Sequence, residues 1–195
     1  MDKAAYALGL SIGQNLMQSG VKSINTADFV AGIEDVLGGR TPQISMQEAQ
    51  RVLNDFFKEL EAKAAGAAKA EGERFLAENA KRPQVKVTPS GLQYEVIEGT
   101  LGQKPKATDT VKVHYEGTLP DGTVFDSSYR RGEPISFALN QVIAGWTEGL
   151  QLMPIGSKYK LYIPYQLGYG ERGAGASIPP YSALIFTVEL LGIGK

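Results

Sequence analysis

The hydrophobic periodicity of this 195-residue chain changes once, between Pro83 and Pro89. Before that point apolar residues recur every three or four positions, which is typical of amphipathic helices; after it they alternate with polar residues, which is typical of strands. We therefore predict an α+β protein with a helical N-terminal part and a β-rich C-terminal part. The expected divisions are a helical dimerisation region over 1–44, a long connecting helix over 45–82 whose first half packs with that region, and a C-terminal domain over 83–195 that begins with a linker over 83–89.

Three helices are predicted in the first part. The first helix spans Lys3–Ser19 and ends before a glycine. The second is capped by Asn25 or Thr26. The third begins at Ser45-Met-Gln-Glu48, a capping box in which two side chains satisfy free backbone donors, and runs to about residue 80. Its second half carries few large apolar side chains, so we expect a solvated spacer there.

The apolar residues of these helices form a thin set for an independent core, and domains this small often need a partner. We therefore expect two copies to pair through their N-terminal helices, which would leave two long arms that carry the C-terminal domains. Gly9 and Gly13 form a small-xxx-small pair that permits close helix approach, although two incidental glycines explain the spacing equally well.

Four segments after Pro89 alternate as half-buried strands do: Leu92–Val96, Val111–Glu116, Lys158–Ile163 and Leu184–Leu190. Asp121-Gly122 predicts a tight turn, and Trp146–Met153 predicts a short helix that Pro154 ends. Several amphipathic strands with one short helix indicate an antiparallel sheet wrapped over that helix.

Composition excludes several kinds of function. A net charge of −1 argues against a general nucleic-acid partner or a polybasic membrane contact. The absence of cysteine excludes disulfides, thiolate nucleophiles and cysteine metal sites. No segment reads as a membrane span or a signal peptide. We expect a cytoplasmic protein with no cofactor or metal, or a periplasmic one if the chain is a processed form.

Four motifs follow one another in the C-terminal part: VKVHYEGTLPDGTVFDSSYRRGEP, VIAGWTEGLQLMPIGSK, YGERGAGASIPP and LIFTVELL. Together they resemble the FKBP-type peptidyl-prolyl cis–trans isomerases over nearly all of residues 88–195. The helical part with its long helix resembles the Mip-like bacterial subgroup of that family. The resemblance implies a five- or six-stranded antiparallel half-barrel around a short helix, with an apolar pocket between them.

The resemblance also implies the residues of that pocket. Trp146 would form the floor for the proline ring, while the N–H of Ile143 and the hydroxyl of Tyr169 would hold substrate carbonyls. Asp126 would lie at the wall, bonded to neighbours such as Tyr115 and Arg131. The implied catalytic residues are Tyr115, Phe125, Asp126, Val142, Ile143, Trp146, Tyr169 and Phe186, and the implied substrate contacts are Arg131, Ile135 and Ile178. Ile135, Ala174 and Ser177 depart from residues frequent in the family, which leaves substrate preference open.

X-Pro isomerisation breaks no bond and needs only rotation about a partial double bond, with a barrier of about 18–20 kcal/mol. A dry aromatic pocket disfavours the charge-separated planar amide relative to the twisted one. The expected partners are unfolded or proline-containing polypeptides, macrolides of the FK506 and rapamycin type, and a second copy in a V-shaped homodimer with chaperone activity. Two alternatives stay open: a non-catalytic module that binds proline segments, and a chaperone scaffold in which isomerisation is incidental.

Two further features have plain structural explanations. His114 alternates with Tyr115 along its strand, so we place it on the face away from the pocket. The glycine-rich residues 170–180 lack the G-x-x-x-x-G-K-[ST] pattern of a phosphate loop. We predict a loop beside the pocket instead.

Overall fold

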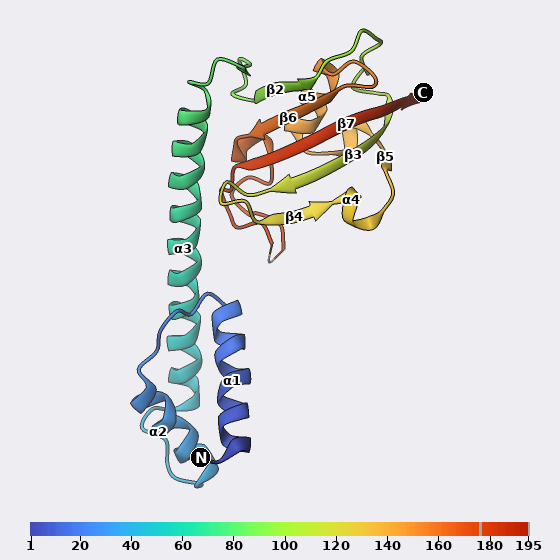
Figure 1. The fold of residues 1–195 in the computed structure, drawn as a ribbon. Coiled ribbons are helices and arrows are strands. Elements are labelled where there is room, and N and C mark those ends of the chain that lie inside the picture. Colours follow the sequence, from blue (N-terminus) through green and yellow to red (C-terminus); the bar gives the residue numbers. More distant parts are fainter. Residues whose placement is uncertain (176, 195) are drawn as a thin grey trace. The chain divides into compact units, whose positions relative to one another are not determined.

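The computed structural model describes residues 1–175 and 177–194. The chain divides into two compact units, Met1–Lys63 and Ala64–Lys195 (Figure 1). No helix within the described residues is both long and apolar enough to cross a membrane.

The first unit contains α1 (Lys3–Gln18), α2 (Thr26–Leu37) and the first part of α3 (Met46–Asn79). Each helix begins at a side-chain cap, as polar residues before a helix favour. Asn25 accepts from the backbone N–H groups of residues 27 and 28, and the Ser45 hydroxyl accepts from the N–H of Glu48 at 3.1 Å. The sequence therefore located all three helix starts.

The first unit buries very little of its apolar surface. Of residues 1–63, all of which the structure describes, only Val21 is buried. The apolar face of α2 is open, with Val36 70% and Leu37 83% exposed. These helices do not complete a core within one chain.

The second unit is built on a seven-stranded sheet in which every pairing is antiparallel. The strands are β1 (Val85–Val87), β2 (Gln93–Glu98), β3 (Thr110–Thr118), β4 (Val124–Ser127), β5 (Ile135–Ala138), β6 (Lys158–Ile163) and β7 (Leu184–Gly194). Their order is β1-β2-β6-β7-β3-β4, and β5 pairs with β3. The α+β class and the antiparallel sheet are confirmed, with more strands than the five or six expected because β1 forms inside the segment predicted as a linker.

The helix α5 (Ala144–Leu152) packs against one face of this sheet (Figure 1). Glycine allows the close approach, because a Cβ at Gly149 would lie 2.7 Å from the Leu161 side chain. Leu150, Leu161 and Val188 are fully buried between helix and sheet. A short helix α4 (Ser128–Arg131) follows β4.

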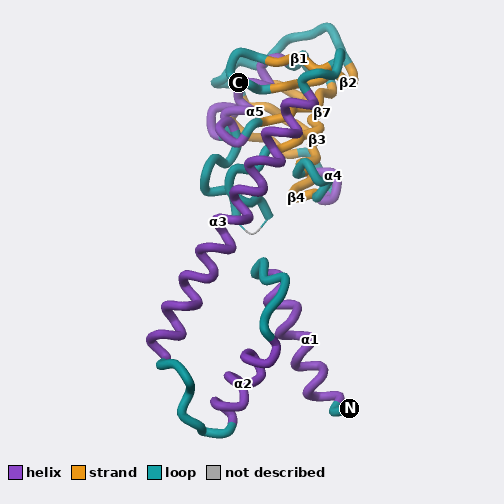
Figure 2. The backbone as a smooth tube through the Cα atoms, turned by 90° about the vertical axis from the view of Figure 1, so that its left-hand side faces the viewer, coloured by secondary structure: helices purple, strands orange, loops and turns teal. Residues whose placement is uncertain are grey.

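The last turns of α3 cover part of the sheet's other face (Figure 2). Phe75 and Leu76 pack against Val85, Tyr162 and Ile185. The expectation that the second half of this helix is a solvated spacer is therefore wrong for these turns. The same contact explains why Ile185, on the face of β7 expected to be exposed, is buried, whereas the rest of the strand keeps the half-buried alternation.

Polar contacts complete this junction between helix and sheet. The buried Asn79 side chain donates to Gln93 at 2.9 Å, and Gln93 donates to the carbonyl of Leu76. Arg82 donates to Tyr162 and forms an ion pair with Glu95 at 2.9 Å. Buried amides require such partners, so the register of α3 on the sheet is fixed.

Candidate active site

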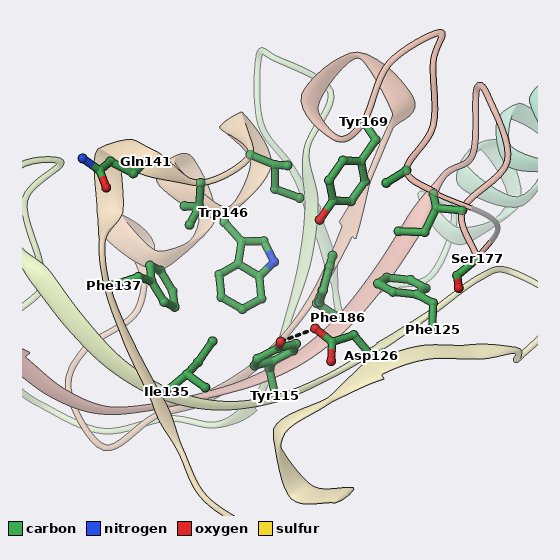
Figure 3. Close-up of a pocket in the computed structure, with 14 residues that line it drawn as sticks. Tyr115, Phe125, Asp126, Ile135, Phe137, Gln141, Trp146, Tyr169, Ser177 and Phe186 are labelled. Atoms are coloured by element: carbon green, nitrogen blue, oxygen red, sulfur yellow. Dashed lines mark hydrogen bonds between the residues drawn. The ribbon is translucent and has the colours of Figure 1, made fainter. Parts of the chain in front are cut away.

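One cavity of about 650 Å³ opens between α5, the sheet and the loops at one end of the sheet (Figure 3). Its walls combine aromatic and aliphatic side chains with a single carboxylate. The lining residues are Tyr115, Phe125, Asp126, Ile135, Phe137, Gln141, Val142, Ile143, Trp146, Tyr169, Ala174, Ser177, Ile178 and Phe186. A concave apolar site with few polar groups is the usual form of a ligand pocket.

Four strands, a turn, a helix and a loop supply these side chains. Tyr115 lies on β3, Phe125 and Asp126 lie on β4, Ile135 and Phe137 lie on β5, and Phe186 lies on β7. The turn before α5 and the helix itself provide Gln141, Val142, Ile143 and Trp146; the segment after β6 provides Tyr169, Ala174, Ser177 and Ile178. The cavity thus forms only when strands, helix and loop from across residues 115–186 come together.

Trp146 lies at the centre of an aromatic cluster in this cavity (Figure 3). Its ring meets Tyr115 and Phe186 edge to face, with centroids 5.0 Å apart in both pairs. Such edge-to-face pairs hold aromatic rings in fixed orientations. Among the described residues, the Trp146 Nε1 is the one buried side-chain polar atom without a hydrogen-bond partner. The floor is therefore aromatic and apolar apart from this one indole N–H.

The polar part of the cavity is a cluster of Asp126, Tyr115 and Arg131. The Tyr115 hydroxyl donates to the Asp126 carboxylate, Arg131 forms an ion pair with the same carboxylate, and Arg131 also donates to the Tyr115 oxygen at 2.9 Å. Tyr115 and Arg131 each donate to the Asp126 carboxylate, so the carboxylate is held at the wall beside the floor.

The pKa values of the cluster follow from these contacts. Burial by itself would raise the pKa of Asp126, but the hydrogen bonds from Tyr115 and Arg131 outweigh it and lower that pKa. Burial, and then the hydrogen bond to Asp126, raise the pKa of Tyr115. Burial also raises the pKa of Tyr169, with a smaller contribution from the Asp126 charge. At neutral pH the cavity therefore holds one ionised carboxylate paired with one guanidinium, and neutral phenols.

Comparison with known proteins identifies the family. Residues 102–191 match the family described as FKBP-type peptidyl-prolyl cis-trans isomerase, and residues 1–96 match the domain amino terminal to it. The chain is 50% identical over 194 residues to the FKBP-type 22 kDa peptidyl-prolyl cis-trans isomerase of Escherichia coli, with 98% of this chain and 94% of the relative covered. The chain belongs to the FKBP-type peptidyl-prolyl cis–trans isomerase family.

Further similarities extend over both units. FkpA of Aeromonas hydrophila is 49% identical, with all of this chain and 76% of the relative covered. The crystal structure of FkpA from Escherichia coli matches with a TM-score of 0.76 at 40% identity, covering 98% of this chain and 95% of that one. The outer membrane protein MIP of Legionella longbeachae is 41% identical over 100% of this chain and 86% of the relative. The chain is therefore an FKBP-type isomerase with the N-terminal helical domain of the FkpA and MIP group.

The structure brings the predicted site residues of this isomerase together. All of them line the cavity except Arg131, which reaches its edge through its bonds to Asp126 and Tyr115. Ile143 is the N-cap of α5, and its carbonyl accepts from the N–H groups of Trp146 and Thr147.

Sequence reasoning missed two lining residues, Phe137 and Gln141. Phe137 was detectable, because it lies two positions after Ile135 on β5 and strand side chains two apart share a face. Gln141 lies in a short 3₁₀ turn, Leu139–Gln141, which has no strong sequence signal. Ala174 and Ser177, noted only as departures from the family, also line the cavity.

His114 does not line the cavity. Its Nδ1 lies 2.8 Å from the Ser128 hydroxyl, and its ring stacks on Tyr129 with centroids 4.7 Å apart. Ser128 in turn bonds the backbone N–H of Tyr115 at 2.7 Å. The sole histidine therefore supports the strand behind the cavity. Among the described residues, no group of three histidine or carboxylate side chains is arranged to hold a metal ion.

Proposed function

We propose that the cavity around Trp146 is the place where this isomerase rotates X-Pro bonds. The observation that carries the proposal is the apolar aromatic floor beside a fixed carboxylate–guanidinium pair. The floor accepts a proline ring and removes water from the amide, which weakens the resonance that keeps the amide planar. An acceleration of about 10⁴- to 10⁵-fold needs only about 5.5–7 kcal/mol of preferential binding to the twisted state.

Each polar residue has a definite part in this proposal. The Tyr169 hydroxyl and the N–H of Ile143 hold substrate carbonyls on opposite sides of the floor. Asp126 is kept ionised by Tyr115 and Arg131, so its negative charge faces the carbon of the rotating carbonyl. Ile135 and Ile178 contact the residues that flank proline. None of these steps transfers a proton, so no general base is required.

The test compares cis-to-trans rates of a short X-Pro peptide for three variants. Trp146→Ala removes the floor and is expected to lower kcat/KM on the order of 100-fold, which corresponds to about 2.7 kcal/mol. Tyr115→Phe removes a hydroxyl that fixes Asp126, and about a tenfold loss is expected. Tyr129→Phe makes the same chemical change outside the cavity and serves as the control. Full activity in Trp146→Ala would place the site elsewhere and favour a cavity that only binds.

We further propose that two chains pair through the first unit, and that the pair acts on unfolded clients as a chaperone. The support is the open apolar face of α2, where Phe29, Ile33, Val36 and Leu37 line a shallow groove. A monomer rarely leaves so many large apolar side chains exposed together. The proposal includes a V-shaped arrangement of the pair and binding of macrolides of the FK506 and rapamycin type in the cavity.

The expected cytoplasmic location finds no support in the comparisons, since one relative is named an outer membrane protein. We propose the periplasm for a processed form of the chain. A chain without cysteine folds equally well under oxidising conditions. Cell fractionation with an antibody to the C-terminal unit tests this.

A further inference from the structure

The outer wall of the cavity is a loop between β6 and β7. We call the described residues Tyr165–Gly175 and Ser177–Ala183 the rim loop. It supplies Tyr169, Ala174, Ser177 and Ile178 to the cavity. Tyr169 is 40% exposed, so this wall lies at the mouth, whereas the buried Trp146 forms the floor. The position of the rim loop therefore governs contacts to the residues around proline more than contacts to the proline ring.

The two ends of the rim loop are tied to each other. The N–H of Tyr181 donates to the carbonyl of Gly170 at 2.9 Å, and the N–H of Gly170 donates to the carbonyl of Tyr165 at 2.9 Å. The rings of Tyr165 and Tyr181 pack edge to face with centroids 5.1 Å apart. Tyr181 has a φ of 60°, a left-handed conformation that a non-glycine residue keeps only when its surroundings hold it.

The helix α3 provides those surroundings. The Lys69 ammonium lies 5.4 Å from the Tyr181 ring centroid and 5.7 Å from that of Tyr165, so one cation contacts both rings. Three residues later on the same helix face, Gly72 is buried against the end of the loop. A Cβ at Gly72 would lie 2.9 Å from the Cβ of Ala183 and 3.2 Å from its backbone nitrogen. Only glycine permits this approach.

We infer that the segment Ala64–Asn79 of α3 is a positioning element of the isomerase site, in which Lys69 and Gly72 hold the ends of the rim loop and thereby set how tightly the cavity binds the residues flanking proline. The inference rests on the proposed location of the active site. Neither residue lines the cavity, so both act through the loop. A loosened loop therefore weakens substrate binding, while the floor that disfavours the planar amide stays intact.

Because the rim loop affects binding and the floor affects the planar amide, the inference predicts a change in KM without an equal change in kcat. Gly72→Ala forces the loop end away from α3 and is expected to raise KM for a short X-Pro peptide on the order of tenfold, with kcat within about twofold. Lys69→Met removes the cation but keeps a long side chain, and a rise in KM of about two- to fivefold is expected, the factor that an exposed cation–π contact corresponds to. Lys69→Arg keeps the cation and should restore wild-type KM.

Two matched controls come from the same helix. Gly66→Ala is the same substitution at a glycine whose added Cβ would meet nothing within 4 Å. Lys63→Met removes an exposed ammonium that forms an ion pair with Glu59 on the same helix. Both are expected to leave KM and kcat unchanged. Thermal melting of every variant, and titration with FK506 followed by the fluorescence of the single tryptophan, Trp146, accompany the kinetics.

The inference is supported if KM and the FK506 dissociation constant rise together in Gly72→Ala and Lys69→Met, with Lys69→Arg and both controls at wild-type values. It is overturned if the two variants keep wild-type KM. It is also overturned if kcat falls while KM rises, and both changes follow the loss of thermal stability. Trp146→Ala measured alongside separates the two proposals. Loss of activity there with unchanged KM in Gly72→Ala contradicts only the positioning role, whereas full activity in Trp146→Ala contradicts the proposed site itself.

Discussion

The two units of this isomerase use their apolar residues in opposite ways. In Met1–Lys63 nearly every large apolar side chain is exposed, and Val21 alone is buried among those residues. In Ala64–Lys195 a continuous core surrounds α5, and several of its leucines are fully buried. A sheet that curls over a helix closes its own core, whereas α1, α2 and the first part of α3 do not close one. The first unit therefore leaves its apolar surface uncovered within one chain, as the proposed pairing requires, whereas the second buries its own core.

The largest expected effect concerns the closed core. Leu161→Ala removes a fully buried side chain that packs on Gly149, and we expect a loss of about 2–5 kcal/mol in the free energy of unfolding. Because this core lies within one chain, the loss should be the same at all protein concentrations. Urea unfolding followed by Trp146 fluorescence measures it. A concentration-dependent midpoint would show that this unit also relies on pairing.

A second variant tests the open face of the first unit. Val36→Lys changes a side chain that is 70% exposed within one chain, so it costs little there and acts only if a partner covers the face. We expect light scattering at micromolar concentration to change from twice the 21.0 kDa chain mass to the mass of one chain. Leu101→Lys, at a fully exposed position of the other unit, is the control. A wild-type protein that is already monomeric contradicts the proposed pairing.

The smallest expected effect concerns pH and the Asp126 cluster. Hydrogen bonds from Tyr115 and Arg131 lower the pKa of Asp126 below its ordinary value of 3.8. A carboxyl group whose pKa is lowered by folding stabilises the protein above its unfolded pKa, and that contribution disappears as pH falls through the folded pKa. Asp126→Asn should therefore cost under about 1 kcal/mol, as exposed ion pairs do.

The pH profile of that cost is the sharper test. The difference in unfolding free energy between wild type and Asp126→Asn is expected to be constant from about pH 5 to 8 and to shrink below about pH 4, since the unfolded carboxyl has a pKa near 3.9. Urea unfolding at several pH values measures it. A difference that grows as the pH falls would mean that folding raises this pKa instead.

The sequence alone predicted the strands of the sheet centre and the helix starts from local signals, namely alternation in β6 and β7 and caps such as Asn25. The cavity residues were implied by the resemblance to the FKBP-type isomerases, through the motifs around Asp126 and Trp146. The packing of α3 on the sheet was missed, because Phe75 and Leu76 are a weak apolar signal in a charged helix. Gly72 carries no local signal in that helix, because its importance depends on Ala183, far away in the sequence.

The most direct test of this division measures the cis-to-trans rate of a short X-Pro peptide with two folded proteins, Val36→Lys and Trp146→Ala. If the second unit alone carries the reaction, the Val36→Lys monomer should keep kcat/KM within about twofold of wild type, while Trp146→Ala should lose on the order of 100-fold, about 2.7 kcal/mol. A Val36→Lys monomer that loses activity as severely as Trp146→Ala would contradict the account, because pairing of the first units would then be part of the catalytic site.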